Sequence, residues 1–386
     1  MAGGGTSFPI LVLGGYGEFG RRISRLLARD PALRVIVAGR SRAKAEIFAA
    51  DIRREAPAAR VEPLAFDIRQ ALPEALAETG ARLVIHCVGP FQHQGYAVAE
   101  TCIAAGVHYI DIADDRAFVC GFDTLGAIAE AKDVLAVSGA SSVPGLSSTV
   151  VEMLRDGVDR VEAVEIAIAS GNQAASGVAV IAAILGYLGR PIPRWRDGRW
   201  AEVHGWQDLR RRTIAGLGIR WLAACDVPDT ALLPSRIPEL RSASFHAGHE
   251  LPALHFMLWG LSWLRRLRLL PSLDRFAPMF RRAALLVARF GSGRGGMSVD
   301  LIGRDAQGAP VRRNWTIVAE GGQGPWIPCL PAVILARKLA SGALRPRGAT
   351  PCWNLFDLDE FADALAEFDI RMTVDSTPFP AHGMAP

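Results

Sequence analysis

The sequence feature that most constrains the fold is a glycine-rich stretch near the N-terminus, Gly-Gly-Tyr-Gly-Glu-Phe-Gly at residues 14–20. It follows an apolar run at residues 10–13, which is typical of a strand buried on both faces, and it opens a stretch with helical periodicity. Gly15, Gly17 and Gly20 have the spacing G-x-G-x-x-G, which allows a tight turn, a close backbone approach to a pyrophosphate and close helix–strand packing. The unpaired N–H groups at the start of the helix favour a phosphate. This context predicts a dinucleotide site, with a purely structural turn as the alternative.

The residues between the glycines belong to the same predicted site. The cofactor-binding set at this loop is therefore Gly15, Tyr16, Gly17, Glu18, Phe19 and Gly20.

The end of the second predicted strand, at residues 34–38, indicates which dinucleotide binds. NAD-binding folds usually carry Asp or Glu about 20 residues after the glycines, to hold the ribose 2′-hydroxyl. This chain has Arg40, Ser41 and Arg42 there instead, with Lys44 close by. Guanidinium groups pair bidentately with a 2′-phosphate, which a carboxylate would repel. We therefore predict NADP(H), with a solvated basic turn at the start of the next helix as the alternative.

Two further strand ends are placed to meet the cofactor. Asp67 follows the third predicted strand, where it can accept from the adenine amino group or cap the next helix. The fourth strand, at residues 83–88, ends at Val88, and Gly89 and Pro90 follow it. Ligands of parallel sheets bind beyond the carboxyl ends of the strands, so we expect this loop to lie behind the nicotinamide.

Candidate proton donors lie just beyond this loop and after the following strand. His93 and Tyr96 come first, and Asp111 and Asp114 lie at the end of the strand at residues 109–112. Histidine titrates near neutral pH and a tyrosine hydroxyl can donate a proton. We name His93, Tyr96 and Asp111 as catalytic candidates, although each is more often structural when taken singly.

Several of these segments together resemble the saccharopine dehydrogenase-like NADP-binding family. The resemblance is specific over roughly residues 8–150 and general beyond. It rests on the glycine stretch and on the segments at residues 38–41, 87–91, 105–111 and 138–148. It implies a Rossmann domain, an α/β substrate domain and hydride transfer with NADPH. The amino-acid-processing branch of the family often has Asp in the Pro-Gly turn; this chain has Ser142 and Val143 before Pro144, which argues against an amino-acid substrate.

The fold prediction is an α/β chain of two domains, which a length of 386 residues accommodates. Residues 1–150 form a doubly wound Rossmann domain. Residues 151–325 form an α/β substrate or dimerisation domain with a mixed, largely antiparallel sheet, because several segments there alternate polar and apolar residues. Residues 326–374 form helices that return to the Rossmann domain, an expectation from the resemblance, and residues 375–386 are a disordered tail.

The segment at residues 251–290 does not fit this scheme simply. It begins with an almost wholly apolar run that contains Trp259 and Trp263, and arginines and two prolines then interrupt it. The run is shorter than the roughly 20 apolar residues that span a bilayer. A buried helix pair or a subunit interface is the default interpretation. Peripheral contact with a membrane, or an apolar substrate pocket, is the alternative.

Composition excludes some partners. The net charge is +4 and no block of lysine and arginine stands out, so nucleic acid is not an expected partner. The six scattered cysteines form no C-x-x-C pair, no metal-ligand spacing is readable, and no leader segment is evident, so we expect a cytoplasmic protein with reduced thiols and no metal. We also expect a homo-oligomer.

The sequence therefore predicts an NADPH-dependent oxidoreductase. Its reaction is hydride transfer to or from an imine, carbonyl or activated alkene of a small molecule, and the apolar segment at residues 251–290 favours a lipid-like substrate over an amino acid. The alternative is a membrane- or partner-associated protein that binds NADP without turnover.

Overall fold

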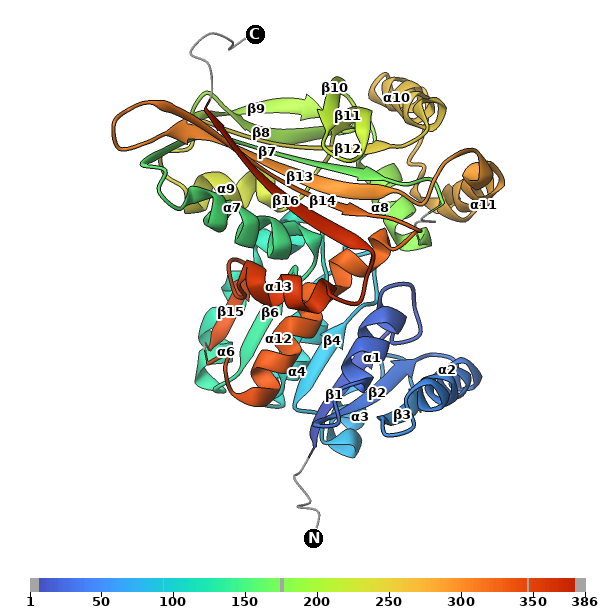
Figure 1. Cartoon of the computed structure of the whole chain (residues 1–386). Helices are drawn as coiled ribbons and strands as arrows, with labels where there is room; N and C mark the ends of the chain where they lie inside the picture. The colour runs from blue at the N-terminus through green and yellow to red at the C-terminus, as the bar shows by residue number, and fades with distance from the viewer. Residues whose placement is uncertain (1–6, 93, 174–176, 346, 379–386) are drawn as a thin grey trace. The chain divides into compact units, whose positions relative to one another are not determined.

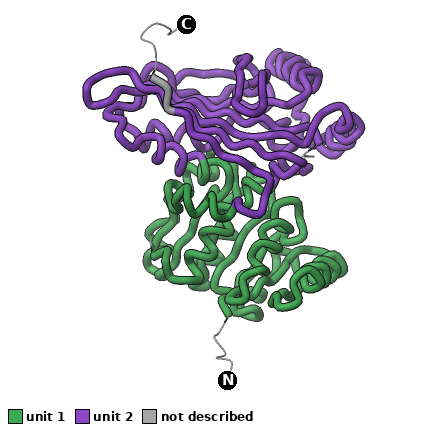
Figure 2. Tube along the Cα trace, in the orientation of Figure 1, with its two compact units in different colours: residues 1–146, 326–364 green, residues 147–325, 365–386 purple. Residues whose placement is uncertain are grey.

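The computed structural model describes residues 7–92, 94–173, 177–345 and 347–378. The chain divides into two compact units (Figure 2). Unit 1 contains Met1–Leu146 and Trp326–Ala364, and unit 2 contains Ser147–Pro325 and Leu365–Pro386.

Unit 1 is built on a parallel sheet of seven strands in the order β15-β6-β5-β4-β1-β2-β3 (Figure 1). The two central strands, β1 and β4, are buried along their whole length, which explains their continuous apolar sequences. The strands are β1 (Phe8–Leu13), β2 (Leu33–Gly39), β3 (Arg60–Ala65), β4 (Leu83–His86), β5 (His108–Asp111), β6 (Leu135–Ser138) and β15 (Gly348–Pro351). The helices are α1 (Gly20–Ala28), α2 (Arg42–Glu55), α3 (Leu72–Thr79), α4 (Ala97–Ala104), α5 (Arg116–Cys120), α6 (Gly126–Ala131), α12 (Leu330–Ser341) and α13 (Leu358–Leu365).

This sheet confirms the predicted doubly wound domain and adds one strand to it. The C-terminal segment returns to unit 1, where α12 contacts α1 and Arg337 donates to the carbonyl of Leu26 at 3.0 Å. The expectation that residues 326–374 are all helical is wrong, because β15 lies within them and pairs with β6. A four-residue strand of Gly, Ala, Thr and Pro carries no apolar run, so its pairing depends on the neighbouring strand.

Unit 2 is built on a seven-stranded sheet in the order β10-β11-β12-β7-β13-β14-β16. The β12–β7 pair is parallel and the other pairs are antiparallel, which confirms the predicted mixed sheet. The strands are β7 (Arg160–Ser170), β10 (Arg210–Ile214), β11 (Gly218–Ala224), β12 (Ser242–His249), β13 (Gly295–Arg304), β14 (Pro310–Ala319) and β16 (Ile370–Pro378), with a separate hairpin of β8 (Pro191–Arg196) and β9 (Arg199–His204). The helices are α7 (Ser147–Arg155), α8 (Val178–Tyr187), α9 (Asp229–Arg236), α10 (Pro252–Arg266) and α11 (Ala277–Val287).

The end of the chain departs from the prediction of a tail from residue 375. Residues 370–378 form β16, which pairs with β14 along its length, so residues 375–378 belong to a strand. The chain passes from unit 1 to unit 2 at the end of α13, between Ala364 and Leu365. Residues 379–386 lie outside the described part of the chain.

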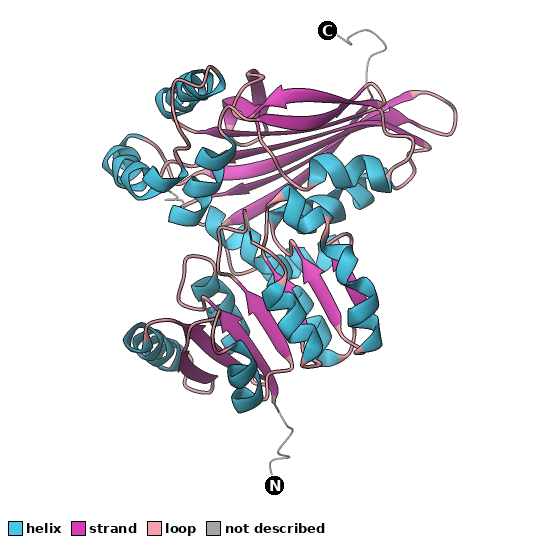
Figure 3. Cartoon of the chain, turned by 180° about the vertical axis from the view of Figure 1, so that it is seen from behind, coloured by secondary structure: helices cyan, strands magenta, loops and turns pink. Residues whose placement is uncertain are grey.

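The segment at residues 251–290 forms α10 and α11, and Figures 1 and 3 place both helices at one end of the unit 2 sheet. The interpretation as a buried helix pair is wrong for the single chain, because Trp263 is 38% exposed, Leu267 62% and Leu286 75%. These apolar side chains remain in contact with solvent. Among the described residues, no helix has both the length and the apolar character needed to cross a membrane.

Candidate functional site

The glycine-rich loop connects β1 to α1 and can be built only from glycines at its tightest points. A Cβ atom at Gly20 would collide with the carbonyl group of Gly14, and one at Gly15 would lie 2.9 Å from the carbonyl oxygen of Val12. Gly17 donates its N–H to the Gly14 carbonyl at 2.8 Å and has equally little room for a side chain. The helix therefore begins closely packed on the strand, as the motif predicts.

Backbone donors are available at the start of α1. The N–H groups of Glu18, Phe19 and Gly20 have no acceptor within the described chain. The Glu18 carboxylate would repel a phosphate, but it is paired with Arg22 at 2.7 Å. The positive end of the helix and these free donors fit a pyrophosphate.

The turn after β2 separates the two predicted arginines. Arg40 is exposed and has no ion-pair partner in the described residues, whereas Arg42 is paired with Glu46 at 2.8 Å. Tyr16 supports this turn, because its hydroxyl accepts the backbone N–H of Ser41 at 2.9 Å. The Ser41 hydroxyl caps α2. Arg40 is thus the guanidinium group that is free to bind a 2′-phosphate.

Asp67 follows β3 and forms hydrogen bonds within the turn that it begins. Its Oδ1 accepts the backbone N–H of Arg69 at 2.9 Å, and its carbonyl accepts from Gln70 and Ala71. The carboxylate therefore closes a turn before α3, whose N-cap is Ala71 without a side-chain cap, so the capping alternative is wrong and the adenine contact stays a prediction.

The loop after β4 is fixed by a residue that the sequence analysis did not identify. The side-chain amide of Gln94 donates to the carbonyls of Val88 at 2.9 Å and Pro90 at 2.6 Å. The Gly89–Pro90 peptide bond is cis. Phe91 packs below the loop against the His86 ring, with centroids 5.1 Å apart. Gln94 therefore fixes the conformation of the loop at the carboxyl end of β4. The sequence signal for this role is an amide side chain four residues after the proline.

The Tyr96 side chain is held by contacts with α5 and the residues that follow it. Its hydroxyl donates to the carbonyl of Phe118 at 2.8 Å, and its ring packs against Phe118 and Phe122. Burial, followed by nearby carboxylates, raises its pKa. A phenol with a higher pKa and an occupied donor argues against the predicted role as proton donor. His93 lies outside the described residues.

Asp111 is completely buried and organises the carboxyl ends of β5 and β6. Its Oδ1 accepts three hydrogen bonds: from the N–H groups of Ala113 at 2.9 Å and Gly139 at 2.8 Å, and from the Ser138 hydroxyl at 3.0 Å. Burial raises its pKa to about 6, against the effect of these donors and of Tyr109. The side chain therefore has a structural role in joining two strand ends.

Asp114 is the better placed carboxyl group. It is half-buried on the loop after β5, and the Gln92 side chain, from the loop after β4, hydrogen-bonds to it. Burial and then the neighbouring Asp115 raise its pKa to about 6. A carboxyl group with this pKa is partly protonated near neutral pH and can donate a proton. The described residues contain no cluster of three or more His, Cys, Asp or Glu side chains that could hold a metal ion.

The parallel sheet with its glycine loop, free helix N–H groups and Arg40 defines unit 1 as a dinucleotide-binding Rossmann domain. Residues 10–137 match the family described as saccharopine dehydrogenase NADP binding domain. This part of the chain is similar to that NADP-binding domain family, as the sequence resemblance implied. The match confirms NADP(H) as the cofactor class of the domain.

Solved structures extend the likeness to the whole chain. Saccharopine dehydrogenase (L-Glu forming) from Saccharomyces cerevisiae is similar over 96% of this chain and 100% of its own, with a TM-score of 0.68 and 14% identity. At this identity the likeness shows the fold alone. GenD2 from gentamicin A biosynthesis, in complex with NAD, covers 96% of this chain and 97% of its own at 17% identity, with a TM-score of only 0.42. No protein with a curated description is detectably similar in sequence.

Proposed function

We propose that the chain is an NADPH-dependent oxidoreductase that transfers a hydride to or from an imine, carbonyl or activated alkene of a small molecule. One observation carries the proposal. The glycine loop, the free Arg40 and the loop held by Gln94 all follow strands of one parallel sheet at their carboxyl ends. That edge is where dinucleotides bind in doubly wound sheets.

Each part has a distinct task in this proposal. The N–H groups of residues 18–20 bind the pyrophosphate, and Arg40 binds the 2′-phosphate. Gln94 keeps the loop at residues 88–90 rigid beside the nicotinamide, which supplies the hydride when the cofactor is bound.

The proton donor in this proposal is Asp114. Asp114 and Asp111 share a pKa raised to about 6, but Asp114 is half-buried, whereas Asp111 is completely buried among structural hydrogen bonds and the Tyr96 hydroxyl is already engaged. His93 stays a candidate from the sequence.

Titration of the purified protein with NADPH and with NADH tests the cofactor site. Tight binding of NADPH and weak binding of NADH is the expected result. Loss of NADPH absorbance with a panel of imines, carbonyls and enoyl compounds then tests turnover. Absence of binding by either dinucleotide would refute the proposal.

A second candidate function is a protein that binds NADP without turnover and acts at a membrane or with a partner. The engagement of the Tyr96 hydroxyl and the burial of Asp111 favour it, because two of the three predicted catalytic side chains have structural roles. Tight NADPH binding with no oxidation by any compound of the panel would support this candidate over the first.

A further inference from the structure

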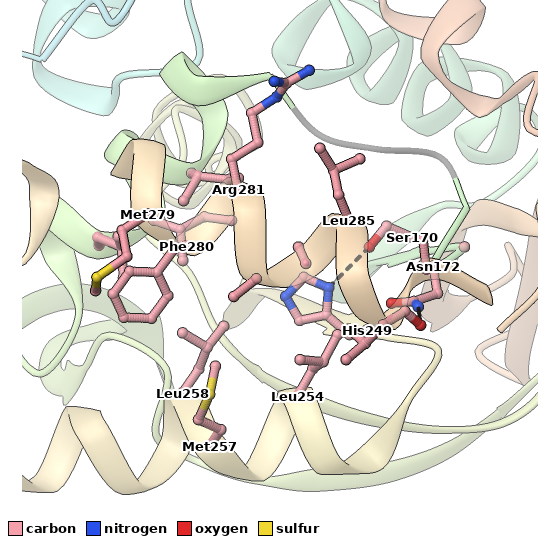
Figure 4. A pocket seen from close by; sticks show the side chains of 18 residues that line it. Ser170, Asn172, His249, Leu254, Met257, Leu258, Met279, Phe280, Arg281 and Leu285 are labelled. Atoms are coloured by element: carbon pink, nitrogen blue, oxygen red, sulfur yellow. Dashed lines mark hydrogen bonds between the residues drawn. The ribbon is translucent and has the colours of Figure 1, made fainter. Parts of the chain in front are cut away.

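Unit 2 contains a pocket of about 320 Å³ that lies between helices α8, α10 and α11 and the ends of β7 and β12 (Figure 4). Aliphatic, methionine and phenylalanine side chains form most of its wall. They include Ile181, Ile184, Leu254, Leu258, Phe280 and Leu285. A pocket of this composition suits an apolar chain.

Two polar side chains of the pocket, His249 and Asn172, are neutral and already oriented, and Arg281 is a charged residue of the lining. His249 projects into it, with its Nδ1 3.2 Å from the Ser170 hydroxyl, and burial lowers its pKa to about 4. The Asn172 amide donates to the carbonyl of Val287 at 2.7 Å. The imidazole therefore carries no charge that would attract a carboxylate or a phosphate, and Figure 4 shows the guanidinium of Arg281 directed away from it.

The helices around the pocket expose a large apolar surface. Ten large apolar side chains between residues 256 and 290 are exposed, from Phe256 at 36% to Leu286 at 75%. The described residues as a whole expose seventeen such side chains, so more than half of them lie on this one segment. Exposed apolar side chains concentrated in this way mark an interaction surface.

The charge of this surface is positive. Residues 251–290 contain seven arginines and one aspartate, although the whole chain has a net charge of only +4. Five exposed arginines there have no ion-pair partner in the described residues: Arg266, Arg268, Arg275, Arg282 and Arg289. A second copy of the chain would meet this face with the same positive charge in a two-fold contact, which disfavours self-association.

We propose that α10 and α11 lie on an anionic lipid bilayer, and that the pocket beneath them accepts an acyl chain from it. Amphipathic helices with aromatic and aliphatic residues on one side and arginines at the borders bind at the headgroup boundary. Arginines near the surface are attracted to anionic lipids, and this attraction weakens with salt. The proposal does not depend on catalysis in unit 1.

Flotation with vesicles tests the surface. The full chain is expected to float with vesicles that contain phosphatidylglycerol, and much less with phosphatidylcholine alone or at high salt. The tryptophans at 259 and 263 should be quenched by brominated acyl chains. Leu286→Glu with Phe290→Glu should reduce vesicle binding by about tenfold or more.

The control places the same change elsewhere on the chain. Ile47→Glu with Ile128→Glu introduces two glutamates at apolar positions of unit 1 that are 64% and 46% exposed, and should leave flotation unchanged. NADPH affinity should be the same in both double variants as in the wild type, so a failure here is distinguishable from a failure of the proposed function.

A fluorescent fatty acid, dansyl-undecanoic acid, tests the pocket. Ala284 lines the pocket, so Ala284→Trp should abolish binding of the probe while flotation persists. Probe binding without flotation would overturn the bilayer as the source of the chain. Flotation with unchanged probe binding in Ala284→Trp would overturn the pocket assignment. Concentration-dependent dimerisation that the Glu substitutions abolish, without flotation, would overturn the proposal in favour of a second copy.

Discussion

The clearest prediction concerns the two arginines after β2, which the sequence treats alike and the structure separates. Arg40 has no ion-pair partner in the part of the chain that the structure describes, so its guanidinium is free to bind a phosphate. A charge-assisted hydrogen bond contributes about 1.5–3 kcal/mol. Arg40→Ala should therefore weaken NADPH binding by about 10- to 100-fold and leave NADH binding nearly unchanged.

Arg42→Ala should have a smaller effect on NADPH. Its guanidinium is 2.8 Å from the Glu46 carboxylate, one helical turn further on. This ion pair within the helix already compensates part of the positive charge of Arg42. Glu46→Gln releases Arg42 and should strengthen NADPH binding modestly. Arg54→Ala, at the other end of α2 and paired with Asp51, is the matched control and should change neither cofactor.

Calorimetric titration of each variant with both dinucleotides, at low and high ionic strength, measures these differences. The NADPH preference of the wild type should decrease with salt, because the site is exposed. Equal losses of NADPH and NADH in Arg40→Ala would refute the 2′-phosphate assignment. A larger loss in Arg42→Ala than in Arg40→Ala would refute the argument from the ion pair.

Three further predictions follow from buried groups and close contacts. Gly20→Ala places a methyl group against the Gly14 carbonyl, so it should lower stability by about 1–3 kcal/mol and abolish NADPH binding. An unchanged melting temperature and an unchanged NADPH affinity would contradict this. Asp229 is buried with a pKa raised to about 7, so its folded form binds protons that the unfolded form releases, and stability should fall as pH rises from about 4 to about 7. Asp229→Asn should therefore be more stable than wild type by about 4 kcal/mol at pH 8, from roughly 1.36 kcal/mol per pKa unit, and no more stable at pH 4. Urea unfolding at the two pH values measures this, and the same stability difference between variant and wild type at both would show the reasoning to be wrong. Asp114→Asn should lower turnover and remove a pKa near 6 from the rate profile without changing NADPH affinity, and an unaltered profile would exclude it as the donor.

Much of unit 1 could be predicted because its signals are local. A buried apolar strand, three spaced glycines and a helix start are adjacent in the sequence, and they determine both the fold and the phosphate site. The separation of Arg40 from Arg42 is not among these local signals, because it depends on the ion pair between the side chains of Arg42 and Glu46.

Other parts depend on contacts between distant residues. β10 reads Arg-Arg-Arg-Thr-Ile, which no apolar pattern identifies as a strand; Arg212 pairs there with the buried Asp300 of β13. The environment of Tyr96 depends on a carbonyl 22 residues away, and the burial of Asp111 depends on donors from the next strand. The sequence indicates that Tyr96 and Asp111 lie near the site, but it does not indicate which distant groups they form hydrogen bonds with.

The return of the C-terminal segment has a consequence for biosynthesis. Unit 2 is an insertion between the first 146 residues of unit 1 and its remaining elements, α12, β15 and α13. A nascent chain that has completed β6 still lacks the strand that covers its edge, and about 200 more residues must leave the ribosome before β15 is available. An unpaired edge strand is prone to pairing with other chains. Translation that stops anywhere within unit 2 therefore leaves an aggregation-prone intermediate. Synthesis of unit 1 begins first, but unit 1 is completed only after most of unit 2 has been made, and β16 alone follows it.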